Sequence, residues 1–278
     1  MSDFLRSMAS SSAARAASIG QAFTARDFDL PTVALDLGVF DLIAEIKERS
    51  PAEGLLLPQG GKRAERARQY LKGGAAAISV LTEPARFGGD MSHLREVVTA
   101  VPGMPVMRKD FLADVRQVLE ARAAGASGVL LIVAILDDPQ LADMLQCAFE
   151  HSLFVLLESF DDDDVARTLR LLDVARYAEK AANKQLLLGV NSRNLRTLEV
   201  EPGRLARLAP LLPAAAVAVA ESGLAEPQDA AEVSSLGYRV ALVGSALMRA
   251  EDPAALVREM LVAGRAAANT EQGNAVIS

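Results

Sequence analysis

Short apolar segments recur along the chain after residue 40 and alternate with longer segments in which apolar residues have helical spacing. Each apolar segment is only a few residues long and almost free of polar side chains, which is typical of a parallel strand buried on both faces. Eight are present, at residues 42–46, 76–81, 105–107, 128–133, 154–157, 186–190, 214–220 and 240–243. The pattern therefore predicts eight buried strands.

The segments between these strands carry helix start and stop signals. KRAERARQYLKGG ends at Gly73 and Gly74, Gly125 ends a later helical segment, and Pro139 stands where another would begin. Successive strands lie roughly 25 to 35 residues apart, the length of a βα unit. Eight such units in 278 residues predict a (β/α)8 barrel. A doubly wound sheet is the alternative, but the sequence contains neither GxGxxG nor a Walker motif.

The eight units occupy residues 41–268 and are predicted to form one catalytic domain. Residues 1–40 are expected to be a helical N-terminal extension, and residues 269–278 a C-terminal tail. The first 26 residues are rich in serine and alanine and contain three arginines, a composition that weakly resembles an organelle transit peptide. A serine-rich start that leads into an ordinary helix is the commoner explanation.

Composition narrows the classes of function. The net charge of −7 and the pI of about 5.1 argue against a protein that follows nucleic-acid phosphates. No apolar stretch approaches the length of a membrane span. The single cysteine, Cys147, excludes an internal disulfide, and its apolar helical surroundings predict a buried structural thiol. We expect a cytoplasmic protein that binds neither nucleic acid nor membrane.

Polar residues follow seven of the eight predicted strands, and a barrel of this kind places its active site at these strand ends. The fourth strand stays apolar and could form an apolar wall. The polar strand-end residues are Glu45, Lys47, Thr82, Glu83, Arg108, Lys109, Asp110, Glu158, Asn191, Ser192, Arg193, Glu221, Ser222, Gly223, Gly244 and Ser245.

The charged members of this set are expected to meet in the barrel mouth. Glu45 and Lys47 lie two residues apart on the first strand, so both side chains can point into the mouth. A single buried charge is costly, but Glu45, Lys47, Lys109, Glu158 and Glu221 together can neutralise one another and shift one another's pKa. A purely structural ion network that plugs the barrel is the alternative interpretation.

Two strand ends suit a phosphate group. AESGL ends the seventh strand and VGSAL the eighth, where barrels often hold phosphate on backbone N–H groups. Glycine lets the backbone approach an anion closely. A glycine at one βα turn is common, but two such turns in succession favour a phosphate site.

The residue types missing from the strand ends also exclude some kinds of active site. Neither His93 nor His151 follows a strand, so a zinc site or a Ser-His-Asp triad is not expected. The interleaved lysines argue against Mg²⁺ at the carboxylates, and the acids at 161–164 are better explained as the start of a helix. No cofactor motif is present. We expect neither a metal nor a cofactor.

Seven segments match one family in order and spacing: AEIKERSP, GAAAISVLTEP, PVMRKDFL, GVLLIVAIL, LLGVNSRNLRTLEV, VAESGL and LVGSALMR. From Asp41 to Glu259 the chain resembles the indole-3-glycerol phosphate synthases of tryptophan biosynthesis. The resemblance implies a cofactor-free carboxy-lyase whose substrate is 1-(2-carboxyphenylamino)-1-deoxyribulose 5-phosphate. The reaction forms a carbon–carbon bond, loses CO2 and then loses water to leave the indole. It also implies that residues 1–40 cap the barrel mouth and allows association with other tryptophan-pathway enzymes.

The resemblance also implies roles for the strand-end residues. Lys109 matches the general acid that protonates the ribulose carbonyl oxygen, and Lys47 matches the lysine that contacts the anthranilate carboxylate. Glu45 matches its acidic neighbour, and Glu158 the base of the dehydration step. We expect the pKa of Lys109 to be lowered by Lys47 and by partial burial. The residues that match those orienting the substrate and completing the network are Asn191, Arg193, Glu221 and Ser222.

The same resemblance implies two binding subsites. The phosphate site would comprise Ser50, Gly223, Gly244 and Ser245. The residues flanking the aromatic ring would be Leu81, Phe87, Phe111 and Leu131.

Three segments depart from the family pattern. SPAEG has Glu53 where a positive charge is usual, FGGD ends in Asp90 instead of serine, and the fifth strand reads LLESF. Two other functions remain as alternatives. One is a related phosphosugar enzyme such as phosphoribosylanthranilate isomerase, which requires a Cys and Asp pair. The other is a non-catalytic barrel that docks to another enzyme.

Overall fold

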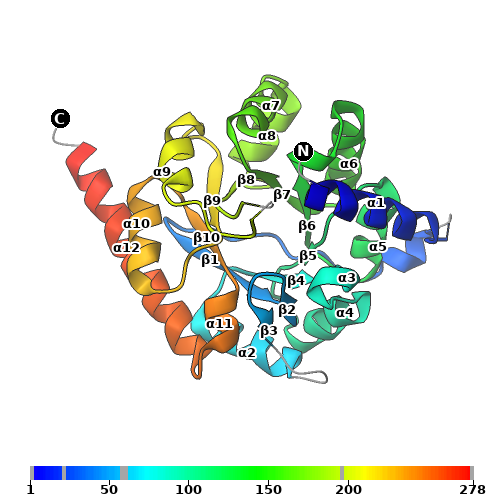
Figure 1. Ribbon diagram of the computed structural model, residues 1–278, viewed down its shortest axis with the longest axis horizontal. Coiled ribbons are helices and arrows are strands. Elements are labelled where there is room, and N and C mark those ends of the chain that lie inside the picture. The colour runs from blue at the N-terminus through cyan, green and yellow to red at the C-terminus, as the bar shows by residue number, and fades with distance from the viewer. Residues whose placement is uncertain (1–2, 21–22, 57–61, 195–196, 276–278) are drawn as a thin grey trace.

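Eight parallel strands close into a barrel, as the sequence predicts (Figure 1). The computed structural model describes residues 3–20, 23–56, 62–194 and 197–275. In the barrel β1 pairs with β10 on one side and with β4 on the other, and the remaining strands follow in chain order. The barrel strands are β1 (Asp41–Ile46), β4 (Ala77–Leu81), β5 (Val106–Lys109), β6 (Gly128–Ile132), β7 (Phe154–Ser159), β8 (Leu186–Asn191), β9 (Val217–Glu221) and β10 (Val240–Val243).

Helices surround the barrel and cover the outward face of its strands (Figure 1). The α-helices are α1 (Asp3–Ala17), α2 (Arg63–Gly73), α3 (Pro84–Phe87), α4 (Met91–Ala100), α5 (Val115–Ala123), α6 (Asp138–Glu150), α7 (Asp162–Leu172), α8 (Ala175–Ala182), α9 (Arg204–Leu208), α10 (Pro227–Ser235), α11 (Ser245–Arg249) and α12 (Pro253–Ala275). Three short 3₁₀ helices are η1 (Ala25–Phe28), η2 (Val133–Ile135) and η3 (Ala209–Leu211).

Side chains alternate along each strand between two apolar cores. Ile43, Met107 and Leu156 belong to the inner core that fills the barrel, whereas Leu42 and Leu157 belong to the outer core between barrel and helices. Because the barrel strands are buried on both faces, their sequences are largely apolar, with polar residues mainly near the strand ends, and show no regular apolar–polar alternation. This burial explains why the strands can be recognised in the sequence as short apolar segments.

The predicted helix signals are found at the helix ends. Gly74 follows α2 with a left-handed backbone (φ 92°), and Pro139 lies in the first turn of α6. Asp161 caps α7 by accepting a hydrogen bond from the N–H of Asp164, so the acids at 161–164 do start a helix.

The structure also contains elements that the apolar pattern does not predict. A two-stranded hairpin, β2 (Arg49–Ser50) and β3 (Gly54–Leu55), follows the first barrel strand, and α8 is an additional helix before β8. Residues 269–275, expected to begin a tail, continue α12. No helix in the described part of the chain combines the length and apolarity needed to cross a bilayer.

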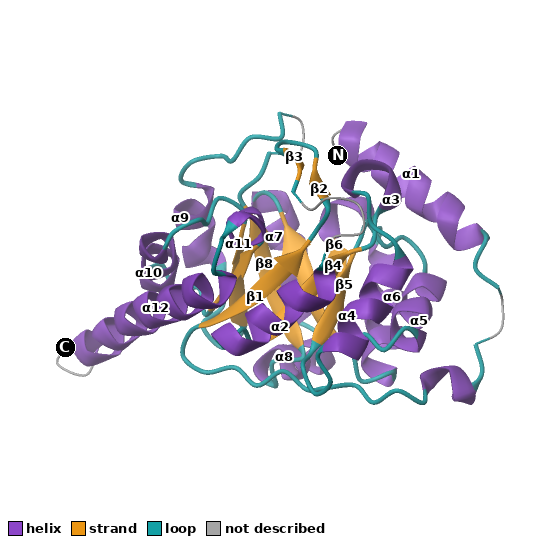
Figure 2. Cartoon of the chain, turned by 90° about the horizontal axis from the view of Figure 1, so that it is seen from below, coloured by secondary structure: helices purple, strands orange, loops and turns teal. Residues whose placement is uncertain are grey.

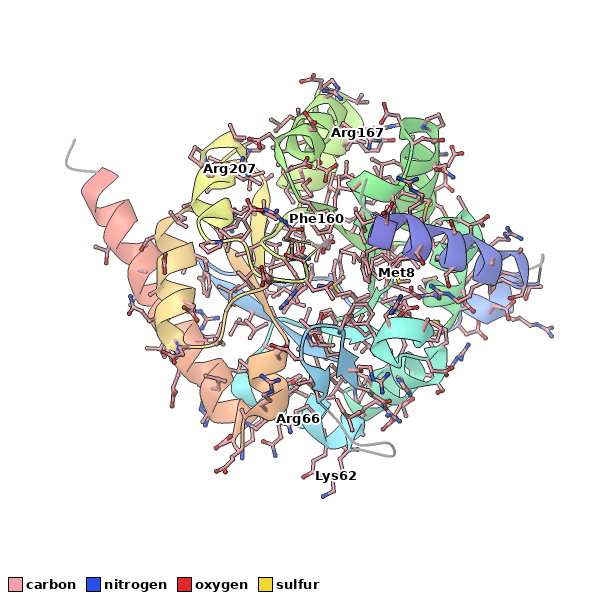
Figure 3. The ribbon with its side chains drawn as sticks, in the orientation of Figure 1. Met8, Lys62, Arg66, Phe160, Arg167 and Arg207 are labelled. Atoms are coloured by element: carbon pink, nitrogen blue, oxygen red, sulfur yellow. The ribbon has the colours of Figure 1, made fainter. Side chains whose placement is uncertain are left out.

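The N-terminal extension contains the helix α1, which lies at the same end of the barrel as the β2–β3 hairpin (Figure 2). Leu5 and Met8 of α1 are buried in the inner core together with Phe111 and Phe160, and Figure 3 labels Met8 on α1. The guanidinium of Arg15 donates two hydrogen bonds to Asp110, at 2.8 and 2.7 Å. Apolar packing and this ion pair therefore hold α1 at this end of the barrel, on the side of β6 (Figure 1).

Candidate active site

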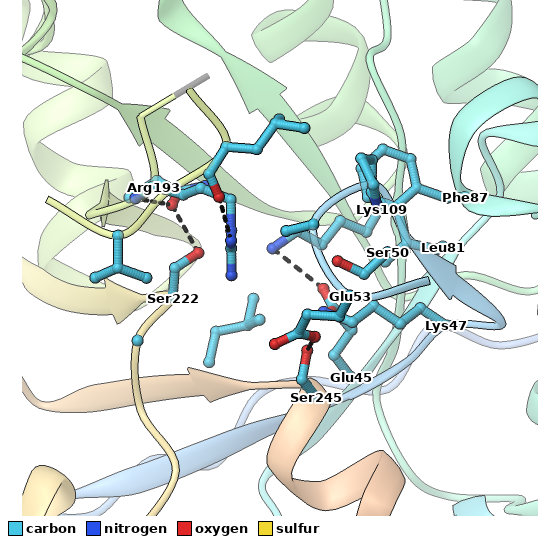
Figure 4. A pocket seen from close by; sticks show the side chains of 18 of the residues that line it. Glu45, Lys47, Ser50, Glu53, Leu81, Phe87, Lys109, Arg193, Ser222 and Ser245 are labelled. Atoms are coloured by element: carbon cyan, nitrogen blue, oxygen red, sulfur yellow. Dashed lines mark hydrogen bonds and ion pairs between the residues drawn. The ribbon is translucent and has the colours of Figure 1, made fainter. Parts of the chain in front are cut away.

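A cavity of about 320 Å³ opens at the carboxyl ends of the barrel strands (Figure 4). Most of the residues predicted from the sequence line it. They are Glu45, Lys47, Ser50, Leu81, Phe87, Lys109, Phe111, Glu158, Asn191, Arg193, Ser222, Gly223, Gly244 and Ser245. Two predicted residues do not. Glu221 is fully buried behind Lys109, and Leu131 faces another way.

A cluster of ion pairs forms the cavity floor. Lys109 Nζ lies 2.8 Å from Glu221 Oε2 and 3.4 Å from Glu45 Oε2, and Lys47 Nζ lies 2.7 Å from Glu45 Oε1. Glu45 thus bridges the two lysines, as its spacing from Lys47 on β1 suggested. Burial alone would raise the pKa of Glu45, but Lys47 and Lys109 outweigh it and lower that pKa to about 2.

The pKa of Lys109 shifts in the direction opposite to the one expected. Burial and the neighbouring Lys47 were expected to lower it. Burial does act in that direction, but the carboxylates of Glu221, Glu45 and Glu158 outweigh it and raise the pKa. Lys109 is therefore a fully charged ammonium at neutral pH, and a proton donor rather than a neutral amine.

Glu158 is the carboxyl group of the cluster that holds a proton most readily. Burial raises its pKa well above the ordinary value, and the adjacent Glu221 carboxylate raises it further, while Lys109 acts in the opposite direction. The floor contains two lysines and three carboxyl groups, so a proton on Glu158 balances its charges.

Two glycines make room for the carboxylates of the cluster because they have no side chain. A Cβ at Gly189 on β8 would collide with Glu221 Oε1, and a Cβ at Gly244 after β10 would collide with Glu45 Oε1. Gly244 matters for Lys47 as well, because the same Cβ would lie 2.9 Å from its Nζ. The ion cluster thus depends on the absence of side chains at two places in the barrel, on β8 and after β10.

Asn191 at the end of β8 connects the charged floor to the cavity rim. Its Nδ2 donates to Glu158 Oε2 at 3.2 Å, and its Oδ1 accepts hydrogen bonds from Ser222 Oγ at 2.8 Å and from the N–H of Arg193 at 2.9 Å. These three contacts define which end of the amide carries oxygen. Arg193 itself donates to the carbonyl of Leu198 at 2.6 Å, which holds its side chain at the rim.

Aromatic and aliphatic side chains form one wall of the cavity. The ring centroid of Phe111 lies 6.0 Å from that of Phe4 and 6.1 Å from that of Phe87, with Leu81 beside them in the lining. This wall suits a flat aromatic ring. Phe4 belongs to α1, far before the first strand in the sequence, and no sequence pattern indicates that it lines the cavity.

The prediction for Leu131 is wrong by one position. Leu131 is fully buried in the outer core between barrel and helices, whereas its neighbours Leu130 and Ile132 line the cavity. Successive side chains of a strand point to opposite faces, and in a fully apolar segment the sequence does not reveal which face is which. The apolar fourth strand does contribute a wall, but through Leu130 and Ile132.

Ser50, Gly223, Gly244 and Ser245, the residues of the predicted phosphate corner, all line the cavity. Ser222 and Gly223 both have left-handed backbones, with φ of 70° and 77°. A left-handed serine is uncommon and is held here by its hydrogen bond to Asn191. Glu53 and Arg249, which were not among the predicted site residues, also line this corner.

Several strand-end residues serve the structure outside the cavity floor. Arg108 points to the outer side of β5 and contacts Thr82, Glu120 and Asp110. Glu83 caps α3 by accepting hydrogen bonds from three backbone N–H groups. Ser192 Oγ donates to the carbonyls of Glu221 and Ser222, which ties β8 to the end of β9.

The remaining predictions concern residues away from the cavity. Cys147 is buried in α6, and burial raises the pKa of its thiol to about 11. His93 lies in α4, and His151 follows α6 and packs on Phe28. Within the described ranges no group of three or more metal-ligating side chains converges.

The family model described as indole-3-glycerol phosphate synthase matches residues 13–260 of the chain. A protein of Nocardioides sp. named indole-3-glycerol phosphate synthase is 48% identical over 221 residues, which cover 79% of each chain. One of the same name from Parafrankia sp. is 44% identical over 223 residues, which cover 80% of this chain and 78% of the relative. The solved 3-hexulose-6-phosphate synthase of Salmonella typhimurium has a TM-score of 0.62 at 18% identity, covers 82% of this chain and 100% of that chain, and shows a similar fold.

Proposed function

The chain belongs to the indole-3-glycerol phosphate synthase family, and we propose that its cavity converts 1-(2-carboxyphenylamino)-1-deoxyribulose 5-phosphate to indole-3-glycerol phosphate. The family activity is a carboxy-lyase reaction of tryptophan biosynthesis. One carbon–carbon bond forms, and CO2 and water leave. The observation that carries the proposal for this cavity is the ammonium of Lys109, held between Glu45 and Glu221 under an aromatic wall.

Ring closure requires a proton on the ribulose carbonyl oxygen as the ring carbon attacks. Lys109 is charged and lies on the cavity floor, so it can deliver that proton, and acid help of this kind contributes about 10²- to 10⁴-fold. Lys47 is the second cation, and its ammonium can pair with the anthranilate carboxylate before CO2 leaves. Glu45 fixes the separation of the two ammonium groups because it binds both.

Loss of water requires a base to remove a proton from the ring. Glu158 is suited to this step because its raised pKa makes its carboxylate a stronger base than an ordinary glutamate. Asn191 orients the Glu158 carboxyl group through its Nδ2.

Binding orients a flexible substrate so that its reacting carbons meet. The phosphate would bind at the corner of Ser50, Gly223, Gly244 and Ser245, and the aromatic ring would lie against Phe87 and Phe111. Anchoring both ends brings the reacting atoms together, and such orientation accounts for much of the rate when no cofactor takes part. We further propose that α1 caps this cavity, since Phe4 contributes to its wall.

A steady-state assay of the purified protein with the carboxyphenylamino deoxyribulose phosphate tests the proposal. Formation of the indole product is followed by fluorescence, with EDTA present and no metal added. We expect turnover that EDTA leaves unchanged. A protein that binds the substrate tightly without converting it would contradict the proposal and would favour a binding role.

A further inference from the structure

Glu53 brings a carboxylate into the corner of the cavity that is proposed to hold the substrate's phosphate. Its carboxylate accepts a hydrogen bond from Ser245 Oγ, and the two side chains point toward each other in Figure 4. Its other oxygen, Oε1, lies 3.8 Å from NH1 of Arg249. The carboxylate therefore occupies two donors that would otherwise be available to an anion.

The backbone holds Glu53 over this corner. Glu53 lies in the turn of the β2–β3 hairpin, where Ser50 pairs with Gly54 and Arg49 with Leu55. The N–H of Glu53 donates to the carbonyl of Ser50 at 3.2 Å. Since Ser50 is itself part of the proposed phosphate corner, the hairpin brings an acid and a phosphate-binding residue to the same place.

A carboxylate and a phosphate dianion need the same donors at this corner. Both accept from Ser245 Oγ and from a guanidinium, and two anions placed side by side repel each other. Arg249 is the one cation paired with Glu53 in the described part of the chain, and its side chain is 56% exposed. One half-exposed guanidinium does not offset both negative charges.

We propose that Glu53 is a specificity-determining residue that competes with the substrate's phosphate for Ser245 and Arg249. The inference rests on the proposed function, because it takes the position of the phosphate from it. Glu53 weakens the binding of any phosphorylated ligand, substrate and product alike, until its carboxylate moves out of the corner. Since Glu53 touches neither lysine of the floor, the chemical step itself is unaffected.

The binding of inorganic phosphate by isothermal titration calorimetry tests the competition without any turnover. Glu53→Gln keeps the shape and a hydrogen-bond acceptor for Ser245 but removes the charge. We expect it to bind phosphate about tenfold more tightly than the wild-type protein at the same ionic strength. Glu65→Gln is the matched control, since it removes one negative charge from exposed α2, outside the cavity, and it should leave phosphate affinity unchanged.

A double-mutant cycle identifies the shared donor. In a Ser245→Ala background the gain from Glu53→Gln should shrink, because one of the contested donors is gone. Unchanged or weaker phosphate binding in Glu53→Gln would overturn the inference and show that Glu53 only keeps the corner in shape. An equal gain in both backgrounds would overturn the role of Ser245 as the contested donor.

Kinetics separate this inference from the proposed function. Glu53→Gln should lower KM for the phosphorylated substrate about tenfold and change kcat little. A protein with normal turnover whose phosphate affinity does not respond to Glu53→Gln contradicts the inference alone. If the wild-type protein lacks turnover while Glu53→Gln binds phosphate more tightly than it does, the proposed function is contradicted and the competition for phosphate stands.

Discussion

Two charged networks meet at the end of β5, one on each side of the strand. Lys109 points into the barrel and joins Glu45 and Glu221, whereas Arg108 points to the outer side of β5 and pairs with Asp110 just beyond the strand. The outer network continues to Glu120 of α5 and to Arg15 of α1. Three consecutive residues therefore divide between two networks, because successive side chains of a strand alternate in direction.

The two networks differ in how completely their polar atoms are paired. Arg108 donates from Nε and both terminal nitrogens, and both oxygens of Asp110 accept, including one hydrogen bond from the N–H of Phe111. In the inner network Glu221 Oε1 has no donor among the described residues, and Glu158 has a raised pKa. The Arg108–Asp110 pair at the centre of the outer network is thus fully hydrogen-bonded, whereas Nε of Arg15 at its edge has no acceptor among the described residues.

The inner network, unlike the outer one, reaches the cavity through its lysines. Lys109 is 13% exposed in its side chain and lines the cavity, whereas the Arg108 side chain is 2% exposed. Both sets of charges bear a cost of burial, but only the inner set faces the cavity. Access to a cavity is what distinguishes groups available for chemistry from groups that hold the fold.

The largest expected effect is loss of activity in Lys109→Ala. Removing the proposed acid should reduce kcat by about 10²- to 10⁴-fold, while the helical content and the cooperativity of unfolding remain those of the wild-type protein. The assay is product fluorescence, accompanied by circular dichroism. A variant that keeps most of its turnover would remove Lys109 from the role of acid.

Arg108→Ala should have the opposite profile. It leaves Asp110 and Glu120 without their buried cation, which we expect to lower the free energy of unfolding by about 3 to 5 kcal/mol. Urea denaturation measures this loss, and the kcat of the protein that remains folded should be close to normal. If Arg108→Ala lost as much kcat as Lys109→Ala, the distinction between the two networks would fail.

The pKa of Glu45 predicts how stability depends on acid pH. Since Lys47 and Lys109 lower that pKa to about 2, Glu45 stabilises the folded state above its unfolded pKa, and this contribution is lost as the pH falls from about 5 toward 2. A shift of this size corresponds to roughly 3 kcal/mol. The pKa of Asp110 is also lowered, so Asp110 likewise stabilises the folded state at neutral pH and loses this contribution in acid.

A comparison with Glu45→Gln isolates the contribution of Glu45. Urea denaturation at several pH values between 2 and 7 should show that the wild-type protein loses more of its unfolding free energy than Glu45→Gln. Parallel pH profiles for the two proteins would show that Glu45 is not held ionised by its lysines.

Arg15→Ala should have the smallest effect of the four. The ion pair with Asp110 is partly exposed on the arginine side, so its loss should cost about 1 kcal/mol of stability. Because α1 carries Phe4 into the cavity wall, a loosened helix should raise KM severalfold and leave kcat nearly unchanged. Arg6→Ala on the exposed face of α1 is the control, and an equal KM change in both variants would contradict the role of the Arg15–Asp110 contact.

The sequence alone determined the barrel and most of its mouth. Eight apolar segments at βα spacing predict the fold because strands buried on both faces contain little else, and the polar residues that end them predict Lys109, Glu158, Asn191 and Ser245 in one cavity. The burial of both strand faces that makes the strands recognisable also explains the one wrong residue. A wholly apolar strand does not show which of its faces is inside. The sequence therefore assigns Leu131 to the cavity, whereas Leu130 and Ile132 line it.

Only the tertiary structure decided the remainder. The pKa of Lys109 depends on three carboxylates from three other strands, and their distances follow from barrel closure rather than from local sequence. Phe4 and Glu53 reach the cavity through the packing of α1 and the turn of the β2–β3 hairpin. Local periodicity records which residues are buried, but the strength of an electrostatic interaction depends on separation in space, which the fold alone establishes.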